Sequence, residues 1–202
     1  MSGVVRIGVA AAVVVFVSVA AVGAEDAVVP AADDTAVASA PVAVTSGPVI
    51  EIWKAERKLE LRQGDVVIRD FRVALGQQPR FGKEHQGDGR TPVGRYYVTE
   101  KKADSRFHRF LGISYPNIDD AERGYRVGLI SATQWADIFF ANLRGDTPPP
   151  NTILGGRVGI HGYGGRPYVP VDWTEGCIAL SDADIEFLYD HAPVGTPIII
   201  NE

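Results

Sequence analysis

Residues 49–73 alternate between apolar and polar side chains with a period of two, and this pattern restricts the chain to a fold rich in β-strands. Val49–Lys54, Lys58–Arg62 and Val66–Val73 all follow the pattern, and the polar segment Gln63–Asp65 separates the last two. Successive side chains of a strand point to opposite faces of its sheet. The alternation therefore predicts a β-meander with one face on a core and the other in water.

The remainder of the chain predicts a mostly β domain (β-rich α+β) with a few short helices. Further strands are expected over four segments: Arg95–Lys101, Arg157–His161, Cys177–Leu180 and Pro197–Ile200. A long loop, Gly76–Gly94, precedes the first of these, and ordered loops of this length often carry function.

Two helices are expected, one over 131–143 and one that begins at Ser181. Ser131 is suited to cap the first helix, and the second helix carries Ile185 and Leu188 on one side. The apolar stripe of the first helix is expected to pack in a core; it consists of Trp135, Ile138, Phe139 and Leu143.

The chain is expected to have three parts: a signal peptide (1–24), a flexible Ala/Pro/Asp-rich linker (25–47) and a catalytic domain (48–202). Arg6, the apolar run 7–22 and the small residues before Glu25 are typical of a secretion signal. We expect a periplasmic protein that touches the membrane only if this segment stays uncleaved as an anchor. Without residues 1–24 the chain has 19 basic and 25 acidic residues, a formal charge of −6. That balance argues against nucleic acid as a partner.

Cys177 is the single cysteine of the sequence and follows His161 by sixteen positions. A lone thiol in an exported protein can form no intramolecular disulfide, which favours a chemical role over plain burial. Thiolates attack carbonyl carbon, and an imidazole can take the thiol proton. The sequence therefore predicts Cys177 as a nucleophile with His161 as its base.

Glycines flank both candidate catalytic residues. Gly176 lets the backbone turn sharply, so that the amides of residues 176 and 177 are expected to face a developing oxyanion. Gly162, Gly164 and Gly165 are expected to let a substrate approach the backbone near His161. Glu175 would raise the pKa of the thiol if its carboxylate faced inward, so we expect it to point away or to pair with a base.

No metal site or cofactor is predicted. The remaining histidines, His85, His108 and His191, have no spacing that places two of them on one helical face. Zinc sites need three or four convergent ligands.

The segments around His161 and Cys177 resemble the signature of the L,D-transpeptidases with a YkuD-type catalytic domain, which remodel bacterial peptidoglycan. The matching positions are His161, Gly162, Thr174, Gly176, Cys177 and Ile178. The segment 89–94, Gly-Arg-Thr-Pro-Val-Gly, resembles the Thr-Pro-x-Gly element of the same family. The resemblance covers about residues 48–202. Glu175 replaces a signature histidine and Ala179 an asparagine, as in a murein L,D-transpeptidase branch with a Trp-Thr-x-Gly-Cys-Ile-Ala core.

The resemblance implies a β-sandwich fold and a reaction on peptidoglycan stem peptides. Cys177 would attack the diaminopimelate carbonyl of a stem tetrapeptide and release D-alanine, while the carbonyl of Gly162 orients His161. An amine of another stem, or a lysine of a wall-linked lipoprotein, would then take the acyl group. A hydrolase that uses the same site, and a noncatalytic peptidoglycan-binding domain, remain alternatives.

Several residues near the motif are candidates for substrate binding. Arginine binds planar carboxylates with two hydrogen bonds, so Arg90, Arg157 and Arg166 could meet the carboxylates of the substrate. The preferred substrate-binding residues are Tyr163, Arg166, Trp173 and Thr174.

Overall fold

The computed structural model describes residues 47–167 and 169–202. The predicted signal peptide and all of the predicted linker except Gly47 lie outside these residues. Along the described stretches, no helix combines the length and the apolar character that a bilayer crossing requires.

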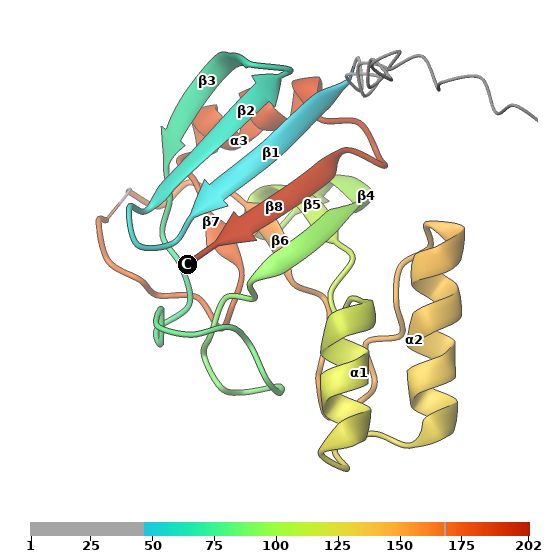
Figure 1. Ribbon diagram of the computed structural model, residues 1–202. Helices are drawn as coiled ribbons and strands as arrows, with labels where there is room; N and C mark the ends of the chain where they lie inside the picture. Colours follow the sequence, from blue (N-terminus) through green and yellow to red (C-terminus); the bar gives the residue numbers. More distant parts are fainter. Residues whose placement is uncertain (1–46, 168) are drawn as a thin grey trace, which may run out of the picture. The chain divides into compact units, whose positions relative to one another are not determined.

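Eight strands form one sheet in the order β3-β2-β1-β8-β4-β5-β6-β7, and three helices accompany it (Figure 1). The strands are β1 Pro48–Trp53, β2 Lys58–Gln63, β3 Val66–Arg72, β4 Gly94–Ser105, β5 His108–Ile113, β6 Gly159–His161, β7 Ile178–Ala179 and β8 Pro197–Asn201. The helices are α1 Ile118–Arg126, α2 Ala132–Arg144 and α3 Asp182–His191. The prediction of a mostly β domain with a few short helices is confirmed.

Strands β1, β2 and β3 form the predicted antiparallel meander. On β1 and β2 the apolar residues of the alternating pattern face the core: Ile50, Ile52 and Leu59 are fully buried. On β3 only Phe71 is buried, and Val66 is 66% exposed. The expected core face is therefore wrong for most of β3, because this strand is the outer one of its half of the sheet.

The two layers of the predicted β-sandwich are two halves of a single curled sheet. Strand β4 is long enough to pair with β8 in one half and with β5 in the other. Beyond β3, Ala74 pairs with Ala179 of β7 through two backbone hydrogen bonds of 2.8 Å. The two edges of the sheet thus meet, and the main core lies inside the curl together with the buried side of α3.

Helices α1 and α2 pack against each other and form a small second core with the segment that follows them (Figure 1). Ser131 caps α2 as predicted, and Ile138 is buried beside Ala121 and Leu154. Leu143, by contrast, is 61% exposed, so only part of the predicted stripe packs in a core. The buried side of α2 consists of Ile138 and Ala141, and Leu143 does not lie on that side.

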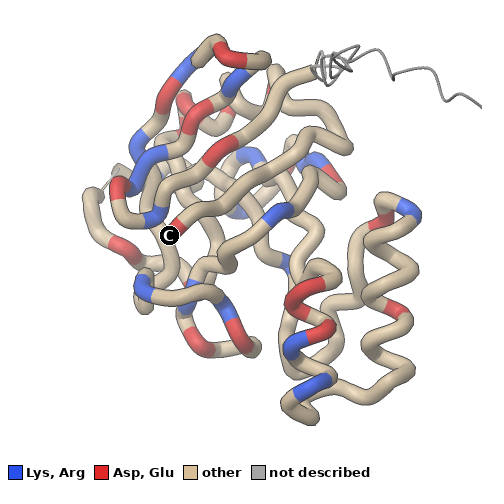
Figure 2. Tube along the Cα trace, in the orientation of Figure 1, with Lys and Arg blue, Asp and Glu red and all other residues tan. Residues whose placement is uncertain are grey.

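Charged residues of both signs are interspersed along the meander (Figure 2). Lys58 Nζ and Arg62 Nη1 each lie 2.5 Å from the carboxylate of Glu60. These charges pair locally within the meander.

Candidate active site

Strands β6 and β7 bring His161 and Cys177 to one face of the sheet. The two strands are parallel, with Ile160 opposite Ile178 and His161 opposite Ala179. Side chains alternate along a strand, so Ile160 and Ile178 enter the core while their neighbours point the other way. Cys177 directly precedes β7, and it therefore shares the outer face with His161, two residues away along the sheet.

The side chains of His161 and Cys177 line the same pocket, whose volume is about 550 Å³. Cys177 is partly exposed, and its Sγ lies 3.9 Å from the carbonyl oxygen of Arg157. Burial raises the pKa of the thiol, and the charge of Glu175 acts in the same direction. A backbone hydrogen bond at Gly159 and the charge of Lys83 oppose this rise in the pKa.

His161 is buried and held in one orientation. Its Nδ1 lies 2.7 Å from the carbonyl oxygen of Gly162 and donates to it, so the contact expected with that carbonyl is present. The ring stacks on Phe107 with a centroid distance of 4.3 Å, and the edge of Trp173 approaches it at 5.8 Å. Burial lowers the pKa of the imidazole, although the Gly162 hydrogen bond counteracts this effect. The neutral ring therefore carries its proton on Nδ1 and leaves Nε2 free to accept one.

The turn that carries Cys177 is organised by Thr174. The buried Thr174 hydroxyl accepts a hydrogen bond from the Gly176 amide at 3.1 Å and donates one to the Cys177 carbonyl at 2.7 Å. Gly176 has φ of +137°, and a Cβ there would lie 2.6 Å from the carbonyl oxygen of Arg90. The sharp turn predicted at Gly176 is confirmed.

Of the two amides that were expected to face an oxyanion, those of residues 176 and 177, the amide of Gly176 does not do so. Because the Gly176 amide already donates to Thr174, it does not face the pocket as a free donor. The Cys177 amide, in contrast, donates to no acceptor within residues 47–167 and 169–202. The amide of residue 177 is thus the one of the two expected donors that stays unpaired, and the Thr174 hydroxyl fixes the peptide groups on either side of it.

The glycine-rich turn after His161 is held by Asp182 at the start of α3. The Asp182 carboxylate accepts hydrogen bonds from the amides of Tyr163 (2.6 Å), Gly164 (3.0 Å) and Gly165 (2.6 Å). A Cβ on Gly162 would lie 2.4 Å from the same carboxylate. The missing Cβ of Gly162 thus serves the approach of Asp182, whereas the sequence predicted the approach of a substrate.

The predicted substrate-binding residues divide into two groups. Trp173 and Thr174 line the pocket. Tyr163 is buried outside the pocket lining, donates its hydroxyl to Val169 and packs on Trp173 at 5.4 Å. The Arg166 guanidinium lies 5.3 Å from the ring of Trp173 and also lies outside the pocket lining. Tyr163 and Arg166 therefore support Trp173 rather than line the pocket.

Two of the three remaining charged candidates line the pocket. Arg157 lines the pocket, whereas Arg90 pairs with Glu84 at 3.4 Å and does not line it. Glu175, which was expected to point away or to pair with a base, is exposed and lines the pocket, and no basic partner of its carboxylate is found among the described residues. Within the same residues, no three histidine, cysteine or acidic side chains are grouped to hold a metal ion.

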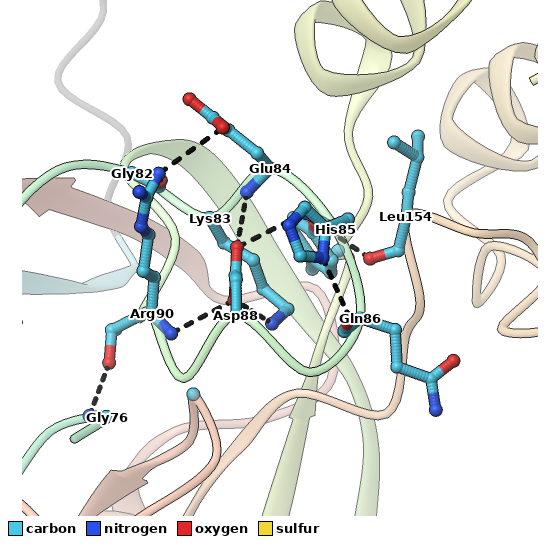
Figure 3. Close-up of polar contacts among 12 residues, drawn as sticks. Gly76, Gly82, Lys83, Glu84, His85, Gln86, Asp88, Arg90 and Leu154 are labelled. Carbon is cyan, nitrogen blue, oxygen red and sulfur yellow. Dashed lines mark hydrogen bonds and ion pairs between the residues drawn. The ribbon is translucent and has the colours of Figure 1, made fainter. Parts of the chain in front are cut away.

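Lys83, Arg106 and Phe107 are among the pocket residues that were not identified from the sequence. Arg106 and Phe107 occupy the turn between β4 and β5, and β5 itself was not predicted. Lys83 lies in the long loop before β4, where its ammonium is 2.7 Å from Asp88 (Figure 3). The sequence marked this loop as functional, but its composition indicated no single residue.

The sequence profile of the YkuD family, described as the L,D-transpeptidase catalytic domain, matches residues 47–200. The chain belongs to this family. The match includes β1 to β7, all of β8 except Asn201, and both His161 and Cys177. The predicted family membership is therefore confirmed.

Similar proteins are known from several bacteria. YafK of Escherichia coli (strain K12), which is provisionally named an L,D-transpeptidase, is 32% identical over 82 residues, or 38% of this chain and 33% of YafK. Solved structures that share the fold include the helical cell shape determining protein Pgp2 of Campylobacter jejuni, with 21% identity and a TM-score of 0.53. Bd1075 of Bdellovibrio bacteriovorus has 19% identity and a TM-score of 0.51. Each structural match covers 77% of this chain but 48% of the solved chain.

Proposed function

We propose that the chain is a peptidoglycan L,D-transpeptidase in which Cys177 is the nucleophile and His161 the general base. The observation that carries this proposal is the placement of both side chains on one face of β6 and β7, in one pocket. The hydrogen bond from His161 Nδ1 to Gly162 adds to it, because Nε2 is left as the proton acceptor.

The electrostatics favour proton transfer during the attack over a preformed ion pair. Burial raises the pKa of the Cys177 thiol and lowers the pKa of the His161 imidazole. Both groups are therefore neutral at rest, and the thiol proton moves to Nε2 as the sulfur approaches a carbonyl. This order is that of general-base catalysis.

The proposed reaction has two acyl-transfer steps. In the first, the sulfur bonds to the diaminopimelate carbonyl carbon of a stem tetrapeptide, and the bond to the terminal D-alanine nitrogen breaks. His161 returns the proton to the departing amine, which leaves a thioester on Cys177. In the second step an amine attacks the thioester carbonyl, His161 takes a proton from the amine, and Cys177 leaves as the thiol. The Cys177 amide stabilises the oxyanion of each step.

The substrate-binding part of the proposal follows the pocket lining. Trp173 and Thr174 remain the proposed wall of the donor site, with Tyr163 and Arg166 behind Trp173. Arg106 and Arg157, which line the pocket, are the proposed partners of the stem carboxylates.

Room for a second stem peptide favours transfer over hydrolysis. A second pocket of about 350 Å³ shares Arg106, Phe107 and Arg157 with the first. We propose that the acceptor amine enters through this second pocket and reaches the thioester past the residues that the two pockets share. The acceptor can be another stem peptide or a lysine of a wall-linked lipoprotein. The proposed location is the periplasm, reached through the signal predicted over residues 1–24.

Product analysis tests the proposal. The purified chain and its Cys177→Ala variant are incubated with disaccharide tetrapeptides, and the products are identified by mass. Transfer gives a dimer that lacks one alanine, whereas hydrolysis gives a tripeptide and binding alone gives no product. Equal product formation by Cys177→Ala would exclude the proposed nucleophile.

A further inference from the structure

The loop between β3 and β4 folds around one buried carboxylate, that of Asp88 (Figure 3). This carboxylate accepts hydrogen bonds from the amides of Glu84 (2.8 Å), His85 (3.2 Å) and Arg90 (3.0 Å). Its fourth partner is the ammonium of Lys83 at 2.7 Å. The side chains of Lys83 and Asp88 are only 5% and 4% exposed. A buried pair this well supplied with hydrogen bonds keeps both charges in fixed positions.

The positive end of this ion pair lies against the Cys177 turn. Lys83 Nζ is 3.5 Å from the position that a Cβ of Gly176 would occupy. Lys83 also lines the pocket together with Cys177, whereas Asp88 does not. The backbone holds the lysine from the other side, because the Lys83 carbonyl accepts a hydrogen bond of 2.9 Å from Arg123 of α1. The loop thus presents a fixed ammonium beside the turn that carries Cys177 and keeps the balancing carboxylate outside the pocket lining.

We propose that Lys83 is a positioning residue whose charge stabilises the Cys177 thiolate, and that Asp88 holds it in place. The inference rests on the proposed function of Cys177 as the nucleophile. Asp88 fixes the position of the Lys83 ammonium, and the ammonium in turn lowers the energetic cost of the negative sulfur that forms when His161 removes the proton. An opposite charge within about 4–6 Å lowers the pKa of an acid by about one to three units.

The other charged groups around Cys177 do not duplicate this arrangement. The charged or titratable side chains that line its pocket are Lys83, Arg106, Arg157, His161 and Glu175. Arg106, Arg157 and Glu175 are exposed, so water and salt weaken their effect on the sulfur. His161 is buried, and its neutral form adds no charge. Lys83 is the buried cation of this set, and its effect on the thiolate is screened least.

The rate of Cys177 alkylation by iodoacetamide, measured against pH, reports the thiolate directly. Because Cys177 is the single cysteine, no other thiol contributes. In Lys83→Met we expect the apparent pKa of the thiol to rise by about one unit, which slows alkylation at pH 7 about tenfold. The matched control is Lys54→Met, which removes a buried lysine that pairs with Glu202 at 3.2 Å, also donates to the Phe81 carbonyl of the same loop, and does not line the pocket. This control is expected to keep the wild-type alkylation profile.

Two further variants separate charge from structure. Lys83→Gln keeps a donor for Asp88 but lacks the charge, and it is expected to behave like Lys83→Met. Lys83→Arg keeps the charge and is expected to have an apparent pKa closer to that of the wild type. Circular dichroism establishes which variants are folded. An unchanged alkylation profile in a folded Lys83→Met or Lys83→Gln, or an equal shift in Lys54→Met, would overturn the inference. Alkylation requires no peptidoglycan, so a failed transfer assay leaves this test intact.

Discussion

The Thr174 hydroxyl offers a sharp test of how the turn that carries Cys177 is held. Thr174→Val removes this hydroxyl and keeps the shape of the side chain. The Gly176 amide and the Cys177 carbonyl then lose partners at 3.1 and 2.7 Å in a buried place. Each buried polar group left unpaired costs about 1–3 kcal/mol, so we expect the loss of both partners to lower the free energy of unfolding by about 2–6 kcal/mol. The displaced Cys177 amide should also reduce kcat/KM by about tenfold to a hundredfold.

Urea denaturation followed by tryptophan fluorescence measures the free energy of unfolding. The matched control is Thr196→Val, because Thr196 is buried to a similar extent but its hydroxyl has no hydrogen-bond partner within the described residues. That substitution removes an unsatisfied group, so stability should stay the same or rise slightly. Equal losses of stability in the two variants would show that the Thr174 hydrogen bonds do not hold the turn.

Three further predictions concern acid stability, the Gly176 turn and the pH profile. Burial alone would raise the pKa of Asp88, but hydrogen bonds from Lys83 and three amides lower it to about 2. The lowered pKa of the Asp88 carboxylate stabilises the fold by about 2 kcal/mol above pH 3.8, and this stabilisation is lost as the pH falls through 2. In Asp88→Asn, the free energy of unfolding measured by urea denaturation should therefore decrease less between pH 4 and pH 2 than in the wild type. Gly176→Ala should lower the melting temperature more than Gly128→Ala does, as measured by thermal denaturation. Both glycines have positive φ, but of the two positions only 176 has another atom within 4 Å of an added Cβ. The pKa of His161 is lowered by burial, so the acid limb of kcat/KM against pH should lie below 6.5, and an inflection above that value would contradict His161 as the base.

The sequence predicted those parts of the fold that depend on local periodicity. The meander over β1–β3 follows from the alternation of apolar and polar residues, and β6, β7 and β8 follow from short apolar runs. Helix α1 was not predicted because Ala121 is its only fully buried apolar residue, so it shows no apolar stripe. Strand β5 was not predicted because it begins with two polar residues, His108 and Arg109, and the apolar residues that follow do not alternate with polar ones.

The site was predictable where chemistry requires a particular residue type. Cys177 and His161 stood out by their type and by the glycines beside them. The hydrogen bond of the Gly176 amide to Thr174 was not predictable, because it depends on the three-dimensional path of the turn. The same holds for Lys83, since its charge reaches Cys177 only through the folding of the loop around Asp88.

The central claim is that Cys177 carries the acyl group during the reaction. Its most direct test is intact-mass measurement of the chain after rapid acid quenching from a disaccharide tetrapeptide, followed by peptide mapping. The account predicts an added mass equal to the substrate minus alanine, located on the peptide that contains Cys177 and missing in Cys177→Ala. An adduct on another residue, or an adduct that persists in Cys177→Ala, would contradict it.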